Sequence, residues 1–237
     1  MVITHKCPMS ATEKNIPPKI RSFIRRQGRI TLAQAQALEN YSDKYCLDPG
    51  LDYDFKEIFQ RDAPLCIEIG FGNGDSLAQI AAENADKDYI GIEVHRPGVG
   101  HLLLQLEQNS ISNVRIYCHD AIEVLEQRVA DNSLDAVHLF FPDPWPKKKH
   151  HKRRIVRASF VDLLVRKLKS GGYFHAATDW ENYAAAMLNL LSANSVMINN
   201  SQTNEYCVRP DYRLLTKFEK RGLRLGHGVW DLIFRKA

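Results

Sequence analysis

No stretch of this chain of 237 residues is long and apolar enough to cross a membrane. The N-terminal segment also lacks the apolar core of a secretory signal. Cysteines number five, and no two of them are spaced as C-x-x-C, so neither a disulfide framework nor a zinc site is indicated. We therefore expect a cytoplasmic protein with no membrane partner and no bound metal.

The remaining composition is that of one globular domain. Apolar residues make up 44% of the chain, the usual share for a protein with a buried core. The length suits one α/β domain and is short for two. We expect residues 1–60 to form a basic, partly helical N-terminal extension and residues 61–237 to form the main domain. No obligatory protein partner is indicated, and we expect a monomer.

Positive charge is concentrated in two places, although the net charge is only +4. Seven Lys or Arg and no acid lie between Lys147 and Arg157. A second acid-free stretch, from Lys14 to Leu38, holds six more. A solvated surface accounts for many such runs, but two local patches on an otherwise slightly acidic chain favour docking of a polyanion, RNA or DNA.

Beyond residue 60, short apolar runs alternate with helical stretches. Runs rich in Ile, Val, Phe and Tyr predict buried strands at 64–70, 88–94, 113–120, 134–141 and 172–178. Amphipathic stretches predict helices at 75–85, 96–109, 121–129 and 157–172, the last ending at two glycines. This alternation predicts an α/β fold with a central, mostly parallel sheet and helices on both faces. Ligands of such sheets bind at the carboxyl ends of the strands.

The first predicted strand ends in a glycine-rich turn with the pattern G-x-G-x-G, formed by Gly70, Gly72 and Gly74. Glycines at alternate positions let the backbone turn tightly and let a ligand lie against it. The dinucleotide fingerprint is G-x-G-x-x-G, and its pyrophosphate would be repelled here by Glu68 and Asp75. A cationic amino acid such as S-adenosylmethionine fits these carboxylates better.

Acids also end the next two predicted strands. Glu93 lies at the end of the second strand, where a carboxylate can accept hydrogen bonds from ribose hydroxyls. Asp120 ends the third, where a carboxylate can accept a bond from an adenine amino group. Either acid alone could be an ordinary helix cap, but acids at three successive strand ends beside a glycine turn favour a cofactor site.

The fourth predicted strand runs into a loop in which prolines occupy alternate positions from Pro142 to Pro146. Proline fixes φ, so the loop is stiff and holds Asp143 and Trp145 at the mouth of the expected cleft. Trp145 offers a flat face on which a base could stack. A stiff turn with a core tryptophan is the alternative interpretation.

The segment FPDPWPKKKHHKRRI, with IEIGFGNG before it and TDWENYA and LLTKFEKRG after it, resembles the bacterial tRNA (guanine-N7)-methyltransferase family. The N-terminal segment RQGRITLAQAQAL is also similar to that family, so the likeness covers roughly residues 20 to 235. The resemblance implies a Rossmann-like class I methyltransferase fold. It also implies transfer of the methyl group of S-adenosylmethionine to N7 of a guanine in the variable loop of tRNA.

Roles for individual residues follow from the same resemblance. Cofactor binding is expected at the glycine turn and at Glu68, Glu93, Asp120 and Asp143, and Asp143 is also the expected catalytic residue. The implied substrate contacts are Lys147, Asp179, Thr216, Lys217, Phe218 and Glu219. The implied RNA-binding stretch comprises Lys149, His150, His151, Lys152, Arg153 and Arg154.

The chemistry of guanine is compatible with these roles. N7 already carries an in-plane lone pair, so positioning and electrostatics are the main requirements. Asp143 could hold the donor's amino group or stabilise the cationic product, and the sequence leaves both open. Asp179 could accept hydrogen bonds from guanine N1–H and the amino group, or it could cap the next helix. Thr216 and Glu219 also have the spacing of a capping box, which is a purely structural alternative.

Three other functions remain to be weighed. A nicotinamide dehydrogenase shares the fold, but the dinucleotide fingerprint is missing. An amino-methyltransferase acting on adenine or cytosine places an acid-proline-aromatic motif after the fourth strand, usually with two adjacent prolines, whereas Asp143 and Trp145 enclose one. A non-catalytic RNA-binding module would need no acids at the strand ends.

Overall fold

Seven strands form one sheet in the order β3-β2-β1-β4-β5-β7-β6, within the part of the chain that the structure describes. The structure is a computed structural model, and it describes residues 21–23, 28–215, 219 and 228–237. Neighbouring strands from β3 to β5 are parallel, and β7 is antiparallel to both β5 and β6. The strands are β1 Leu65–Ile69, β2 Asp88–Ile92, β3 Val114–Tyr117, β4 Leu134–Phe140, β5 Leu168–Thr178, β6 Met197–Asn199 and β7 Trp230–Lys236.

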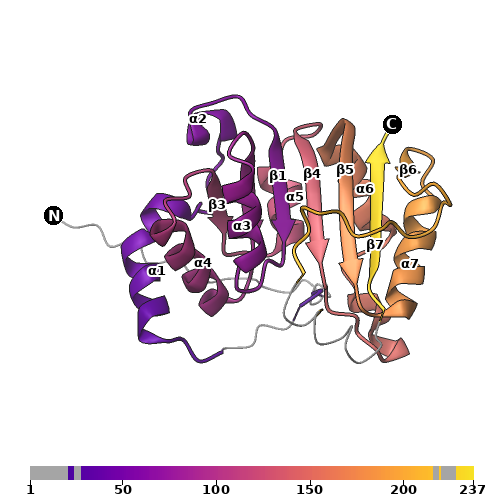
Figure 1. The fold of residues 1–237 in the computed structure, drawn as a ribbon, viewed down its shortest axis with the longest axis horizontal. Helices are drawn as coiled ribbons and strands as arrows, with labels where there is room; N and C mark the ends of the chain where they lie inside the picture. The colour runs from indigo at the N-terminus through magenta and orange to yellow at the C-terminus, as the bar shows by residue number, and fades with distance from the viewer. Residues whose placement is uncertain (1–20, 24–27, 216–218, 220–227) are drawn as a thin grey trace, which may run out of the picture.

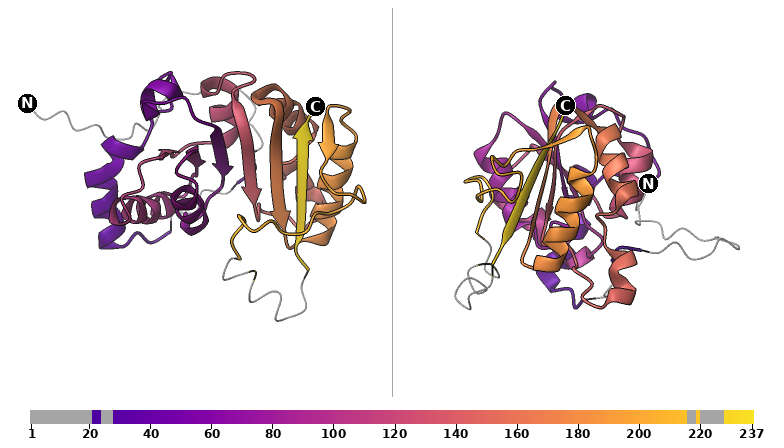
Figure 2. Two further views of the ribbon diagram at one scale, coloured as in Figure 1. Left: turned by 45° about the horizontal axis from the view of Figure 1, so that its top comes forward. Right: turned by 90° about the vertical axis from the view of Figure 1, so that its right-hand side faces the viewer.

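Helices cover both faces of the sheet, as Figures 1 and 2 show. Side chains alternate between the faces along each strand, so Ile67 belongs to a core cluster with residues of α5, α6 and α7, while Cys66 belongs to one with residues of α1, α3 and α4. The helices are α1 Leu32–Tyr45, α2 Phe55–Phe59, α3 Asp75–Glu83, α4 Arg96–Gln108, α5 Ala121–Arg128, α6 Ala158–Lys167 and α7 Glu181–Ser192, with a 3-10 helix, η1, at Lys148–Arg153. This arrangement confirms the predicted α/β class.

One predicted boundary is wrong. The helix expected at 157–172 ends at Lys167, and Leu168 already pairs with Leu134 in the sheet. The glycine pair therefore lies within β5 and not after a helix, with Gly171 at a φ of +79°. The physical reason is that this segment pairs with β4 as a strand. Lys169 also binds Asp135 of β4 at 2.7 Å. Tertiary contacts override the helical pattern here.

The extension before residue 60 packs closely on the main domain where the structure describes it. Helix α1 begins with a capping box between Thr31 and Gln34 and lies on α4. A side chain at Gly100 would approach the carbonyl oxygen of Gln34 to 2.7 Å, so glycine allows the two backbones to meet. Leu47 then donates its N–H to Ile116 of β3 at 2.8 Å. Among the described helices, none has the length and apolar content to span a membrane.

Candidate active site

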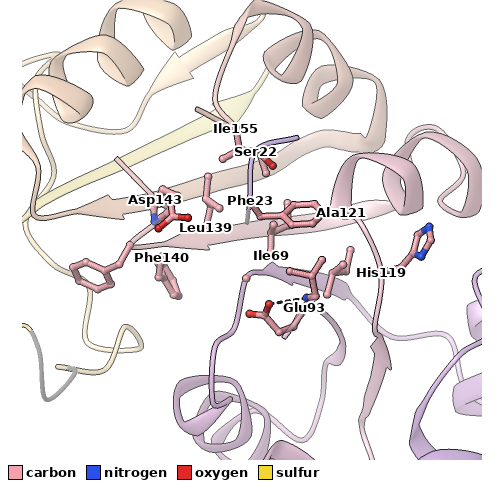
Figure 3. A pocket seen from close by; sticks show the side chains of 15 residues that line it. Ser22, Phe23, Ile69, Glu93, His119, Ala121, Leu139, Phe140, Asp143 and Ile155 are labelled. Carbon is pink, nitrogen blue, oxygen red and sulfur yellow. Dashed lines mark hydrogen bonds between the residues drawn. The ribbon is translucent and has the colours of Figure 1, made fainter. Parts of the chain in front are cut away.

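A hollow of about 230 Å³ opens at the carboxyl ends of the central strands. Its walls include Gly70 of the glycine turn after β1, the end of β2 and the start of the loop after β4. Glu93 and Asp143 both line it, and Figure 3 shows that they reach it from different strand ends. The hollow therefore lies where the rule for ligands of such sheets predicts a binding site.

The glycine turn requires its glycines. Gly70, Gly72 and Gly74 have φ values of +71°, +61° and +82°, in the left-handed region that disfavours other residues. A Cβ at Gly70 or Gly72 would meet no atom within 4 Å, so this stretch of backbone borders open space. A Cβ at Gly98 of α4 would come within 2.0 Å of the Gly72 carbonyl oxygen. The turn is thus supported from behind by α4 and is accessible in front.

The carboxylate of Glu93 fastens the end of β2 to this turn. One oxygen accepts a hydrogen bond from Gly72 N–H at 2.9 Å, and the other accepts from Val94 and His95 N–H at 2.6 and 2.9 Å. A carboxylate has about four acceptor sites, so capacity remains for ligand hydroxyls. Sequence reasoning located Glu93 correctly at the hollow but did not anticipate that it also holds the turn.

Glu68, near the end of β1, is not among the residues that line the hollow. Its side chain is buried, and its Oε2 atom has no hydrogen-bond partner among the described residues. Burial raises the pKa of this carboxyl to about 8, because the charged form loses its hydration. An unpartnered carboxyl of this kind would gain from a cation or a hydrogen-bond donor placed nearby.

Asp120 is the N-cap of α5 and is also largely buried. Its Oδ1 atom accepts the N–H of Ile122 at 2.9 Å. The hollow is lined by its neighbours, His119 and Ala121, and His119 is held by Glu123 at 2.9 Å. The structure therefore displays the capping role of Asp120, while its expected contact with a cofactor stays a prediction.

The loop after β4 has an unusual backbone. Phe141 and Trp145 have φ values of +51° and +45°, which are uncommon for bulky residues. These two residues flank the exposed Asp143. Phe141 N–H donates to Ala177 at 2.7 Å, and Trp145 Nε1 donates to the carbonyl of Ser22 at 3.2 Å. Contacts on both sides therefore hold a strained segment that presents Asp143, as is common at functional sites.

The basic run forms η1 and divides into exposed and buried cations. The side chains of Lys147, Lys149 and Lys152 are exposed. Arg153 is half-buried, with its guanidinium 5.0 Å from the centre of the Trp145 ring. His150 lies edge-on to the same ring, and His151 is half-buried. Arg153 and His150 therefore already contact the ring of Trp145, which leaves less of the ring for stacking with a base than the sequence suggested.

Arg154 does not fit the RNA contact expected of it, because only 5% of it is exposed. Its Nε atom donates to the carbonyl of Pro144 at 2.9 Å, and Nη2 donates to Asn182 at 2.9 Å. The guanidinium also lies 4.6 Å from the centre of the Tyr183 ring. These contacts tie the proline loop to the start of α7. The sequence could not separate this arginine from its neighbours, since all lie in one cationic run.

The residues expected to contact the substrate lie in different environments. Asp179 is exposed after β5 and is not the cap of α7, because the N-cap residue is Trp180. Glu219 is buried, and its carboxylate binds Arg213 at 2.6 and 2.8 Å. Thr216, Lys217 and Phe218 lie outside the described residues. Substrate contact by this group remains a prediction.

Sequence reasoning did not anticipate that residues of the N-terminal extension line the hollow. Ser22 and Phe23, from the N-terminal extension, line it beside Ile69 and Leu139. The only sequence signal for their place at the hollow was the aromatic side chain of Phe23 within an otherwise basic stretch. Of the second basic patch, the structure describes Arg21 and Arg29 but not Arg25 or Arg26. No group of three or more His, Cys, Asp or Glu in the described ranges could hold a metal ion.

Comparisons with known proteins agree with this geometry. A family model described as "Putative methyltransferase" matches residues 62–232. The tRNA (guanine-N(7)-)-methyltransferase of Shewanella amazonensis is 55% identical over 92% of this chain and 92% of its own. The enzyme of that description from Chromobacterium violaceum is 51% identical over 92% of this chain and 96% of its own.

A solved structure supports the fold separately. The crystal structure of an aminoglycoside resistance methyltransferase superposes with a TM-score of 0.52, over 77% of this chain and 92% of that one. Its sequence is only 15% identical, so the likeness concerns the fold alone. Identity above 50% over nearly the whole length is far stronger evidence, and with the matched motifs it shows that this chain belongs to the tRNA (guanine-N7)-methyltransferase family.

Proposed function

We propose that this chain transfers the methyl group of S-adenosylmethionine to N7 of a guanine in the variable loop of tRNA. The observation that carries the proposal is that Glu93 and Asp143 both line one hollow beside the glycine turn. The loop that carries Asp143 leads directly into the basic 3-10 helix η1. Family membership adds the substrate class and leaves the dehydrogenase alternative without support. A cytoplasmic location would follow from a tRNA substrate.

The residues of the hollow suit S-adenosylmethionine. Gly70 and Gly72 border open space, so the amino-acid part of a ligand could lie against their backbone. Glu93 could accept hydrogen bonds from ribose hydroxyls with its remaining lone pairs. Glu68 is a buried carboxyl with an unpartnered oxygen, and a nearby cationic group would lower the cost of ionising it. His119 and Ala121, beside Asp120, would border the adenine.

The reaction needs orientation more than proton transfer. When bound, S-adenosylmethionine supplies a methyl group on a positively charged sulfur. Guanine N7 is a hydrogen-bond acceptor with a free lone pair, so no residue has to remove a proton from it. Asp143, exposed at the hollow and held by a stiff loop, would face the positive charge that develops on the base. Asp179 would orient the base through guanine N1–H and the amino group.

The exposed cations of η1 and the lysine just before it would hold the RNA backbone. Lys147, Lys149 and Lys152 extend into solvent next to the loop that carries Asp143. Phosphate contacts position a nucleic acid without reading its sequence. Arg153 and Arg154, which contact Trp145 and Pro144, would instead keep the basic helix in place.

The decisive experiment is nucleoside analysis of tRNA. An unmodified tRNA transcript is incubated with the protein and methyl-labelled donor, then digested and chromatographed. We expect the label in 7-methylguanosine, and the same transcript lacking the variable-loop guanine should take up none. Label in another nucleoside, or no label with a correctly folded protein, would contradict the proposal.

A further inference from the structure

Arg213 is a buried arginine that the assignments above leave without a function. Only 1% of it is exposed, and two carboxylates surround it. Its guanidinium donates to Asp231 at 2.6 and 2.9 Å and to Glu219 at 2.6 and 2.8 Å. Four of the five N–H groups of the arginine are therefore used in two fork-like pairs.

The network around Arg213 continues into the sheet. Asp231, on β7, also binds Nε2 of His175 on β5 at 2.8 Å, and the Tyr212 hydroxyl binds Nδ1 of the same ring at 2.9 Å. Burial alone would raise the pKa of Asp231, but the hydrogen bonds from His175 and Arg213 outweigh burial and lower it. Asp231 is thus held as a carboxylate, and it anchors Arg213 firmly to two adjacent strands.

The same guanidinium reaches the loop that presents Asp143. It lies 5.6 Å from the centre of the Phe141 ring, within the range of a cation–π contact. Phe141 lines the hollow, has a left-handed backbone and lies two residues before Asp143. One side chain therefore joins Phe141 after β4, Asp231 on β7 and Glu219.

We propose that Arg213 is a positioning residue that fixes the carboxylate of Glu219 and the Asp143 loop relative to each other. The inference rests on the proposed function, in which Asp143 faces the guanine, and on the substrate contact expected of Glu219. Burying a cation with two carboxylates seldom adds stability compared with apolar packing. A hydrogen-bonded network of this kind specifies one arrangement of its side chains. Methyl transfer requires such an arrangement, because the donor and the base must be held in line.

The first test is Arg213→Lys, which keeps the charge but cannot form two forks. We expect single-turnover methylation of tRNA to fall roughly tenfold to a hundredfold, as for loss of charged hydrogen bonds. The Kd for S-adenosylmethionine should stay within about threefold, because Glu93 and the glycine turn are untouched. The matched control is Arg115→Lys, a half-buried arginine on β3 that binds the carbonyls of Ser112, Val114 and Ile58. A lowered melting temperature with a wild-type rate in Arg213→Lys would overturn the proposal.

The second test is a double-mutant cycle with Glu219→Gln. If Glu219 depends on Arg213 for its position, the double variant should be little slower than the slower single variant. Multiplied effects would show that the two residues act independently, which contradicts the proposal. If Arg213→Lys does not fold, Asp231→Asn weakens the same anchor with little change of shape, and an unchanged rate there would also overturn it. Failure of the wild-type protein to methylate tRNA would instead refute the proposed function.

Discussion

Glu93 and Gly72 are joined by a hydrogen bond of 2.9 Å, which holds the glycine turn after β1 against the end of β2. The same carboxylate accepts two further backbone N–H groups, from Val94 and His95. A residue that the sequence suggests as a ribose acceptor is therefore also the support of the backbone on which a cofactor would lie. Because Glu93 would both bind the ribose and support the turn, its mutation should weaken cofactor binding more than the loss of either function alone.

We expect Glu93→Ala to weaken binding of S-adenosylmethionine by roughly tenfold or more, since hydrogen bonds to a charged group are each worth about 1.5–3 kcal/mol. Calorimetric titration of the donor measures the change. Glu93→Gln keeps one acceptor oxygen and should lie between the alanine variant and wild type. Wild-type affinity in Glu93→Ala would rule out the ribose role.

Substitution of Asp143 tests the chemical step. Asp143→Asn keeps the size of the side chain and removes its charge, and Asp143 is exposed at the hollow, so the fold should not change. We expect methyl transfer to slow by about a hundredfold or more, by analogy with loss of one oxyanion-hole donor. Single-turnover rates at saturating donor and tRNA give the answer. A rate within a few-fold of wild type would show that the carboxylate is not catalytic.

The cations of η1 should govern tRNA binding. Replacing Lys149, Lys152 and Arg153 by glutamine should weaken binding at low salt and reduce the salt dependence by roughly one unit of slope or less per lost contact. Arg153 should contribute less than the lysines, because it is half-buried against Trp145. Anisotropy titrations at several salt concentrations measure this, with Lys56→Gln as a control on a distant surface. An unchanged slope in the triple variant would mean that the run is only a solvated surface.

The buried carboxyl of Glu68 predicts a dependence of stability on pH. Its pKa of about 8 lies above the ordinary value, so the folded state holds a proton that the unfolded state releases. The ligand-free protein should therefore lose stability as the pH rises from about 4.5 to about 8. Glu68→Gln removes this titration, so its melting temperature relative to wild type should rise across that window.

Thermal unfolding of both proteins at about pH 5 and pH 8 provides the comparison, with the donor absent. Glu83→Gln, an exposed acid on α3, serves as a control that should show no such trend. Parallel melting curves for Glu68→Gln and wild type across the range would refute a raised pKa.

Much of the fold follows from the sequence, because hydrophobic patterning is local. Five parallel strands and the four helices between them are predicted from runs such as residues 88–94, and the glycine turn is recognisable because glycine tolerates its φ values best. Helix α7, which follows β5, was not among the predicted helices. Strands β6 and β7 were not predicted. The final boundary of α6 was wrong, since pairing of Leu168 with Leu134 depends on residues far apart in the chain.

The sequence by itself determined the class of fold, the glycine turn and the residue types at the strand ends, since each depends on a short stretch of chain. It could not distinguish Arg154 from Arg153, because a run of cations carries no information about which of them is buried. Only the tertiary structure buried Arg154 beneath Pro144, and only it enclosed Arg213 between Asp231 and Glu219. Burial and the pairing of charges depend on packing between distant segments, and that packing decides which charged residues can meet a substrate and which hold the site together.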